Sequence, residues 1–427
     1  MKRYKAEAFD KMQYLYGAAH DPLIHGVFWL SGHIDTDVLK RAVTISLSAI
    51  PMIRCCVAVK AGGPCWMDHG FTGGDIVRTV SAAGDEEQQI QRLLADTIDI
   101  FHEPQLKIYV LQADSADTLC IIINHMVCDG TGFKEYLRLL ADLYTRCANH
   151  NPDIPAPDFY PRHIRQLFSG FGFWDKVRIF FLKYDISMQR KQTPLRFEGN
   201  PAAPFFSTLT IDKDQVAQVK AESRLRGVTL NDMVLCAYIR VLHRRTGEAR
   251  IVMPCPVDLR KYLPPGSRHG ICNLTSNYIC DIAIGPDDTP NHTLEQVSKQ
   301  MNAQKESRSC LKSMISMALS FRLIPFSVMR SAFTKVFTIP VVSYTNLGVI
   351  DQKTLKFGSL TATDAFLTGA VKRVPYFQIA ISTFDGCCTL SSNMFGTADD
   401  RAAADRFLAE VRDELLSFVS HERLIYA

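Results

Sequence analysis

The sequence predicts an α/β protein of two lobes, in which helices cover mixed β-sheets. Three observations support this prediction. At 427 residues the chain is too long for one ordinary hydrophobic core and suits two. Segments with strand and helix periodicity alternate irregularly and include hairpin signals, which argues against a regular parallel barrel. The two halves carry comparable sets of strands and helices, so a pseudo-twofold pair is plausible, although no internal repeat is strong enough to prove it.

The first half alternates amphipathic helices with apolar strands. Asp35 precedes apolar residues at helical spacing, and acidic residues at 85–87 suit the first turn of a helix, where they complement its dipole. In order, we expect a helix at 10–16 capped by Asp10, a strand at 25–34, a helix from 35 that Pro51 ends, strands at 52–59 and 65–69, a helix at 84–98, paired strands at 106–111 and 118–123, and a long amphipathic helix at 131–147.

Three prolines within residues 149–158 predict a stiff linker. We therefore divide the chain into an N-terminal lobe at 1–158, a connecting amphipathic helical segment at 159–200 and a C-terminal lobe at 201–427. Residues 163–190 mix aromatic with basic side chains. Such a segment favours either a helix pair that lies across both lobes, which is the simpler interpretation, or a peripheral contact with a membrane surface or an acyl chain.

The second half has the same mixed character. Glycines at 227 and 247 end two helices, and Pro325 breaks another. We expect strands at 205–211, 251–256, 276–284, 340–344, 377–383 and 389–395, and helices at 214–226, 231–245, 294–307, 313–335 and 399–420.

Composition excludes several classes of function. The net charge of +4 is mild for this length and predicts no nucleic-acid partner. Thirteen cysteines form no CxxC pair, so we expect neither a metal site nor a disulfide framework, and a reducing, cytoplasmic setting. Without a run of eighteen apolar residues or a signal-like start, no membrane span or leader is expected.

One stretch carries candidate chemistry. An apolar run at 119–123 predicts a buried strand that ends at Asn124-His125, and Asp129-Gly130 follows four residues after the histidine. An imidazole held rigidly at a strand end suits a general base. The alternative is a satisfied histidine followed by an ordinary turn, and this short pattern alone does not decide between them.

Three further segments join this one. Residues 256–260 are a strand end that delivers Arg260, residues 343–348 read as a strand ending in a polar turn with Asn346 and Gly348, and residues 50–54 connect a helix to a strand. Together the segments resemble the CoA-dependent acyltransferase superfamily, which includes chloramphenicol acetyltransferase and the condensation domains of peptide synthetases, and the three main motifs follow one another in the order of that superfamily. The alcohol acetyltransferase and polyketide-associated branch is the most similar.

The resemblance implies two chloramphenicol-acetyltransferase-like lobes with a tunnel between them. His125 matches the catalytic base, and Asp129 matches an orienting aspartate that points away from the tunnel and pairs with Arg260. Asn346 and Gly348 match a late loop near the tunnel. Gly130 would allow backbone or substrate to approach closely.

The expected reaction moves an acyl group from acyl-CoA, or from the thioester of an acyl carrier protein, onto a small alcohol or amine. It needs no metal, no permanently bound cofactor and no covalent enzyme intermediate. Backbone amides after His125, or the hydroxyls of Ser343 or Thr345, are candidates for stabilising the oxyanion. Condensation domains carry a second histidine where this chain has Asn124, which favours a stand-alone transferase. The alternative is a catalytically silent module that binds a thioester-linked chain or a partner.

Overall fold

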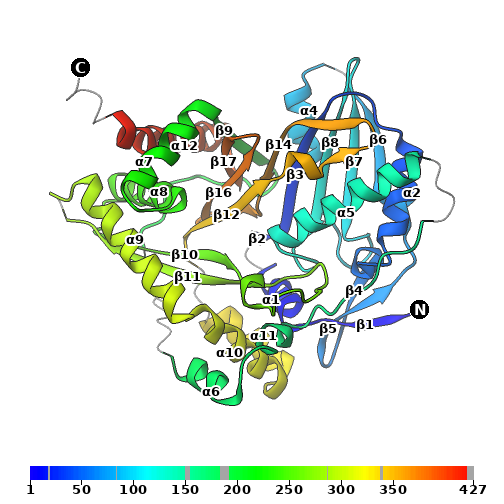
Figure 1. Ribbon diagram of the computed structural model, residues 1–427, viewed down its shortest axis with the longest axis horizontal. Coiled ribbons are helices and arrows are strands. Elements are labelled where there is room, and N and C mark those ends of the chain that lie inside the picture. Colours follow the sequence, from blue (N-terminus) through cyan, green and yellow to red (C-terminus); the bar gives the residue numbers. More distant parts are fainter. Residues whose placement is uncertain are drawn as a thin grey trace.

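Two six-stranded mixed sheets form the centres of two lobes that lie side by side in the computed structural model (Figure 1). The model describes residues 1–17, 20–82, 84–149, 154–182, 192–285, 287–336 and 340–420. Helices cover both sheets, which confirms the predicted fold class.

The sheet of the first lobe has the strand order β13-β14-β3-β8-β7-β6. Its pairs are antiparallel except β6 with β7. Helices α2 (Thr36–Ser46) and α5 (Gly130–Ala148) cover one face and α4 (Glu86–Leu94) covers the other. The strands are β3 (Leu23–Leu30), β6 (Val77–Ser81), β7 (Leu106–Gln112), β8 (Asp117–Asn124), β13 (Lys356–Phe357) and β14 (Leu360–Thr368).

Strand β8 carries the candidate histidine at its end and is buried along its whole length. Ile121 and Ile123 pack on the side of α2 and α5, whereas Cys120 and Ile122 pack on the opposite side. Side chains of a strand alternate between the two faces of its sheet, so a continuous apolar run is what a doubly covered strand requires. The buried strand therefore gives the residues that follow it a rigid base.

The sheet of the second lobe has the order β12-β16-β17-β15-β2, and β9 also pairs with β17. Helices α7 (Lys213–Leu225), α8 (Leu230–Thr246) and α12 (Ala398–Ser420) pack in this lobe, and α9 (Pro290–Ser307) packs on the β10–β11 hairpin. The strands are β2 (His20–Asp21), β9 (Pro204–Ile211), β10 (Arg250–Asp258), β11 (Thr275–Ala283), β12 (Val342–Ile350), β15 (Val371–Lys372), β16 (Phe377–Phe384) and β17 (Cys387–Phe395).

Smaller elements complete the described chain. A three-stranded sheet has the order β1-β5-β4, and α1, α6, α10 and α11 gather at one end of the molecule (Figure 1). The bounds are β1 (Arg3–Lys5), α1 (Ala8–Tyr16), η1 (Pro51–Arg54), β4 (Cys55–Lys60), β5 (Gly63–Asp68), α3 (Gly73–Ile76), η2 (Ile164–Phe168), α6 (Phe173–Phe181), η4 (Arg260–Tyr262), α10 (Cys310–Leu323), α11 (Phe326–Val336) and η5 (Gln352–Thr354).

The two halves of the sequence exchange strands. Strand β14, from the second half, pairs antiparallel with β3 in the first lobe, and β2, from the first half, pairs antiparallel with β15 in the second. No strand was predicted at residues 360–368, where a bulge between Ala362 and Asp364 interrupts the regular pairing. These two strand pairs join the lobes but do not locate the boundary between them. The division of the chain at residues 158 and 201 therefore stays a prediction.

Several expected boundaries change. The first helix begins at Ala8 with Glu7 as its N-cap, so the prediction that Asp10 caps it is wrong. The predicted helix at 84–98 ends at Leu94. The predicted break at Pro325 is confirmed, because it separates α10 from α11. Residues 150–153 of the linker and 183–190 of the aromatic-basic segment lie outside the described residues.

Candidate active site

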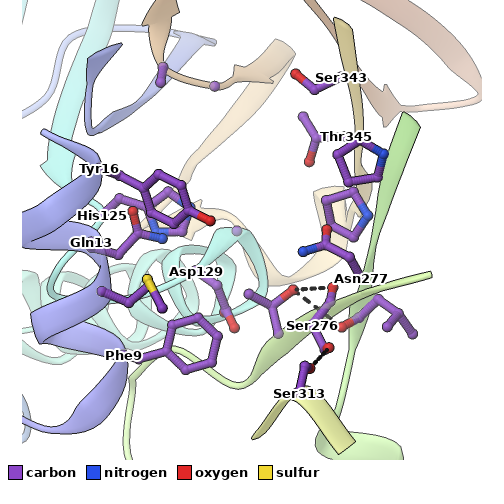
Figure 2. A pocket seen from close by; sticks show the side chains of 18 of the residues that line it. Phe9, Gln13, Tyr16, His125, Asp129, Ser276, Asn277, Ser313, Ser343 and Thr345 are labelled. Atoms are coloured by element: carbon purple, nitrogen blue, oxygen red, sulfur yellow. Dashed lines mark hydrogen bonds between the residues drawn. The ribbon is translucent and has the colours of Figure 1, made fainter. Parts of the chain in front are cut away.

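A cavity of about 580 Å³ lies between the lobes and is bordered by residues of both. Its walls come from α1, the turn after β8, the β10–β11 hairpin, α10, β12 and β15. Figure 2 shows His125 and Tyr16 on one side of it and Ser343 and Thr345 on the opposite side. Cavities of this size suit a small organic ligand.

The turn after β8 is shaped by Asn124, which is fully buried. Its side-chain Oδ1 accepts from the amide of Met126 at 2.9 Å, and its Nδ2 donates to Oε1 of Gln105 at 2.7 Å. The amide of His125 donates to the carbonyl of Pro22 at 2.8 Å. An asparagine side chain that accepts from the backbone two residues on stabilises such a turn. The next residue, His125, is thereby fixed at the cavity.

The imidazole of His125 is oriented by Asn273. Its Nδ1 lies 3.1 Å from Oδ1 of Asn273, whose Nδ2 donates to the carbonyls of His125 and Met126 at 2.8 and 3.3 Å. Because the carbonyl of His125 requires a donor, the amide nitrogen must face it and the amide oxygen must face the ring. Nδ1 therefore carries the proton, and the lone pair of the imidazole is on Nε2.

Burial lowers the pKa of His125 from its ordinary value. Its own backbone carbonyl, the charge of Asp129 and the bond to Asn273 act in the opposite direction without reversing the shift. An imidazole whose pKa lies below 6.5 is neutral at neutral pH. The side chain is thus in the state that a general base requires.

The carboxylate of Asp129 is 4% exposed and is held by three donors. It accepts from Nη1 of Arg260 at 3.0 Å, from the amide of Gly132 at 2.8 Å and from the amide of Leu274 at 2.7 Å. Burial alone would raise the pKa of Asp129, but Arg260 and the two amides outweigh it and lower that pKa. The ion pair that the resemblance implied is therefore present, and Asp129 also caps α5. Asp129 is nevertheless among the residues that border the cavity, so its expected direction away from the tunnel stays a prediction.

Gly130 allows the start of α5 to approach β12. A Cβ at Gly130 would lie 2.5 Å from Cδ2 of Leu347, so a side chain there would require the end of Leu347 to move. The predicted polar turn at 343–348 is wrong, since β12 continues to Ile350 and carries a bulge between Asn346 and Gly348. Gly348 has a φ of +75°, which favours glycine. Asn346 borders the cavity and donates to Oδ1 of Asn231 at 2.9 Å.

Sequence reasoning missed three residues at this site. Asn273 is 1% exposed, and its one signal was a polar residue within an apolar stretch. Arg162, which follows the predicted linker, donates to the carbonyls of Met126 and Val127 and forms a buried ion pair with Asp10 at 3.0 Å. Lys372 borders the cavity from the short strand β15. Nothing in the local sequence marked any of these three as part of one site.

Two other kinds of site are absent from the described ranges. No group of three or more histidine, cysteine, aspartate or glutamate side chains is arranged to hold a metal ion there. No helix in the same ranges combines the length and the apolar character needed to cross a bilayer.

Comparison with known proteins shows the family of this chain. A family model described as "Condensation domain" matches residues 16–311. Bacitracin synthase 3 of Bacillus licheniformis is 22% identical over 293 residues, which are 65% of this chain and 4% of the synthase. Chondramide synthase cmdD of Chondromyces crocatus is 23% identical over 297 residues, which are 64% of this chain and 7% of the synthase. The chain thus spans less than a tenth of these relatives.

Solved structures share the fold along nearly the whole chain. Polyketide synthase associated protein 5 of Mycobacterium tuberculosis superposes with a TM-score of 0.70 at 15% identity and covers 99% of this chain and 98% of its own. TRI3 trichothecene 15-O-acetyltransferase of Fusarium sporotrichioides gives 0.71 at 14% identity and covers 97% and 95%. The first condensation domain of the CDA synthetase gives 0.69 at 13% and covers 98% and 97%. The chain belongs to the condensation-domain family.

Proposed function

We propose that this protein transfers an acyl group from a thioester, carried by CoA or by an acyl carrier protein, to an alcohol or amine, with His125 as the general base. One observation carries the proposal. His125 borders the cavity, and its Nε2 has no hydrogen-bond partner among the described residues, while Asn273 holds the proton on Nδ1. That tautomer leaves Nε2 free to accept a proton.

The chemistry balances without a metal or an enzyme-bound intermediate. Nε2 accepts the proton of the acceptor hydroxyl or amine as its oxygen or nitrogen attacks the thioester carbonyl. The tetrahedral intermediate then collapses, the carbon–sulfur bond breaks, and the imidazolium returns the proton to the departing thiolate. Asp129 and Arg260 touch neither substrate in this account. They fix the turn and the start of α5, and so position His125.

The oxyanion requires donors that are not already engaged. The amides of Met126 and Val127 donate to Asn124, so they are not available. The amides of Gly130 and Thr131 begin α5 beside the cavity, where a helix leaves its first N–H groups without intrahelical partners. The hydroxyl of Thr345 borders the opposite wall. We propose these groups as oxyanion donors, and do not include Ser343, whose hydroxyl donates to the carbonyl of Phe377 at 3.5 Å.

The test measures thiol release from acyl-CoA donors, and acyl loss from acylated carrier protein, with and without a panel of alcohols and amines. Replacing His125 by alanine or glutamine should abolish acceptor-dependent release, while the circular dichroism spectrum and the free energy of unfolding stay near those of the wild type. Retention of most activity by either variant refutes the mechanism. If the wild type binds thioesters without releasing thiol to any acceptor, the silent binding module is the better description.

A membrane-surface variant of this function has one observation in its favour. On α6, Phe173, Trp174 and Phe181 are 71%, 78% and 75% exposed, and Lys176 and Arg178 lie on the same helix. Exposed aromatic residues with basic neighbours suit the interface of an anionic bilayer. Sedimentation with vesicles of anionic and of neutral lipids tests this variant, and absence from the pellet with both removes it.

A further inference from the structure

One charged group in the cavity has no role in the proposed transfer. Lys372, on β15, borders the cavity together with His125 and lies among residues that leave it only partly accessible. Burying a charge is costly unless an opposite charge or several hydrogen-bond acceptors compensate it. A cation kept at this position without such compensation therefore indicates a ligand.

The described residues provide no such compensation. No hydrogen bond or ion pair joins the ammonium group to any of them, and no acidic side chain influences its protonation. Asp21, on the strand paired with β15, is influenced by the charge of Arg373 instead. The other lysine that borders the cavity, Lys312, differs, because its ammonium donates to the carbonyl of Leu182.

The ammonium is nevertheless charged at neutral pH. Burial lowers the pKa of Lys372 to about 8, which still leaves the group mostly protonated at pH 7. Its charge is among the influences that lower the pKa of His125, so it acts close to the reacting centre.

Another wall of the cavity is apolar. Helices α1, α10 and α11 contribute a group of flexible thioether and aromatic side chains. These residues are Phe9, Met12, Met314, Met317, Phe321 and Met329. Methionine side chains adapt to apolar ligands of varied shape. The cavity thus combines an adaptable apolar wall with a lysine ammonium that has no partner among the described residues.

We infer that the cavity binds a substrate with an apolar body and one anionic group, such as a carboxylate, which forms an ion pair with Lys372. This inference rests on the proposed function, in which the substrate reacts at His125. The phosphates of CoA do not fit this role, because the whole pantetheine arm separates them from the thioester that must reach the histidine. The anionic group therefore belongs to the acyl group or to the acceptor.

Binding is tested in the His125→Ala background, so that the readout is independent of catalysis. The probes are decanoate and 1-decanol, which share an apolar chain and differ in charge, together with CoA, and calorimetry measures affinity. Lys372→Met should weaken decanoate binding at least about tenfold and change 1-decanol binding by less than about threefold. Lys372→Arg should retain most of the decanoate affinity, and CoA binding should not change with either substitution.

Lys312→Met is the matched control, since it removes a lysine of the same cavity whose ammonium already has a partner. It should leave the ratio of decanoate to 1-decanol affinity unchanged. At pH 8.5, decanoate should draw a proton onto Lys372, so the binding enthalpy should depend on the ionisation enthalpy of the buffer, and this dependence should vanish in Lys372→Met.

Equal loss of both probes in Lys372→Met, loss of CoA instead of decanoate, or an unchanged decanoate affinity overturns the inference. If the wild type shows acceptor-dependent thiol release and Lys372→Met leaves the decanoate affinity unchanged, the proposed function stands and only the anionic substrate is refuted. Charge-dependent binding through Lys372 without any thiol release would do the reverse, because the ligand class would stand in a protein that does not transfer.

Discussion

Replacing Asp129 by alanine should destabilise the protein by about 3–5 kcal/mol, because truncation of one member of a buried, hydrogen-bonded ion pair leaves the other uncompensated. The carboxylate is the acceptor for the guanidinium of Arg260 and for the amides of Gly132 and Leu274. Leu274 is fully buried, so water does not replace the lost acceptor there.

The separate contributions support this range. Each buried N–H left without a partner costs about 1–3 kcal/mol. Arg260 keeps some compensation, since Glu135 lies 3.3 Å from its Nε and Asp258 lies 3.2 Å from its Nη1. The part of the destabilisation that comes from Arg260 is therefore at the lower end of the cost of breaking a buried ion pair. Because stabilities of natural domains are about 5–15 kcal/mol, the variant should fold but unfold at clearly lower denaturant concentration.

Urea denaturation followed by circular dichroism measures this change, and acceptor-dependent thiol release measures activity on the same samples. A double-mutant cycle with Arg260→Met should give a coupling of about 1–3 kcal/mol between the two positions. A loss below about 1 kcal/mol in Asp129→Ala, or additive effects in the cycle, would refute the orienting role. Lost activity with unchanged stability would instead assign Asp129 to the chemistry.

Three further perturbations test the site and its support. Gly130→Ala should lower the free energy of unfolding by about 1 kcal/mol, since only the end of one side chain must move. Gly132→Ala should lower it by about 2–3 kcal/mol, because its Cβ would meet a backbone oxygen at 2.9 Å. The urea midpoints of the two variants test this order. Asn273→Asp should shift the acid limb of the pH–rate profile upward, because a carboxylate beside the ring raises the pKa of His125, and an unshifted limb would contradict the contact. Burial lowers the pKa of His25 to about 4 in the folded protein. As the pH falls from 6.5 to 4, the unfolded chain therefore protonates this imidazole before the folded chain does. The free energy of unfolding should decline by about 3 kcal/mol in that window. Relative to wild type, His25→Asn should lose this decline when unfolding is measured between pH 4 and 7, and equal slopes would contradict it.

Local sequence was sufficient for most elements and for the centre of the site. The apolar run of β8 and the spacing of α5 predict a strand and a helix because periodicity depends only on neighbouring residues. His125 and Asp129 belong to the segment that joins them, so they could be named together. Arg260 lies 131 positions from Asp129 and was found through the resemblance to a known superfamily, not through any local pattern. The catalytic roles of these residues stay predictions.

The tertiary structure decided what surrounds that segment. Asn273 lies 148 positions from His125, and it fixes the proton on Nδ1 through contacts that no sequence period records. Lys372 reaches the cavity because β15 lies between β17 and β2, a strand from the other half of the chain. Strand exchange and the pairing of buried charges depend on contacts between distant segments, whose free energies are set by burial and geometry. The sequence alone therefore singled out His125 as the candidate base, and only the folded chain showed its contact with Asn273 and, in the same cavity, a lysine without a partner among the described residues.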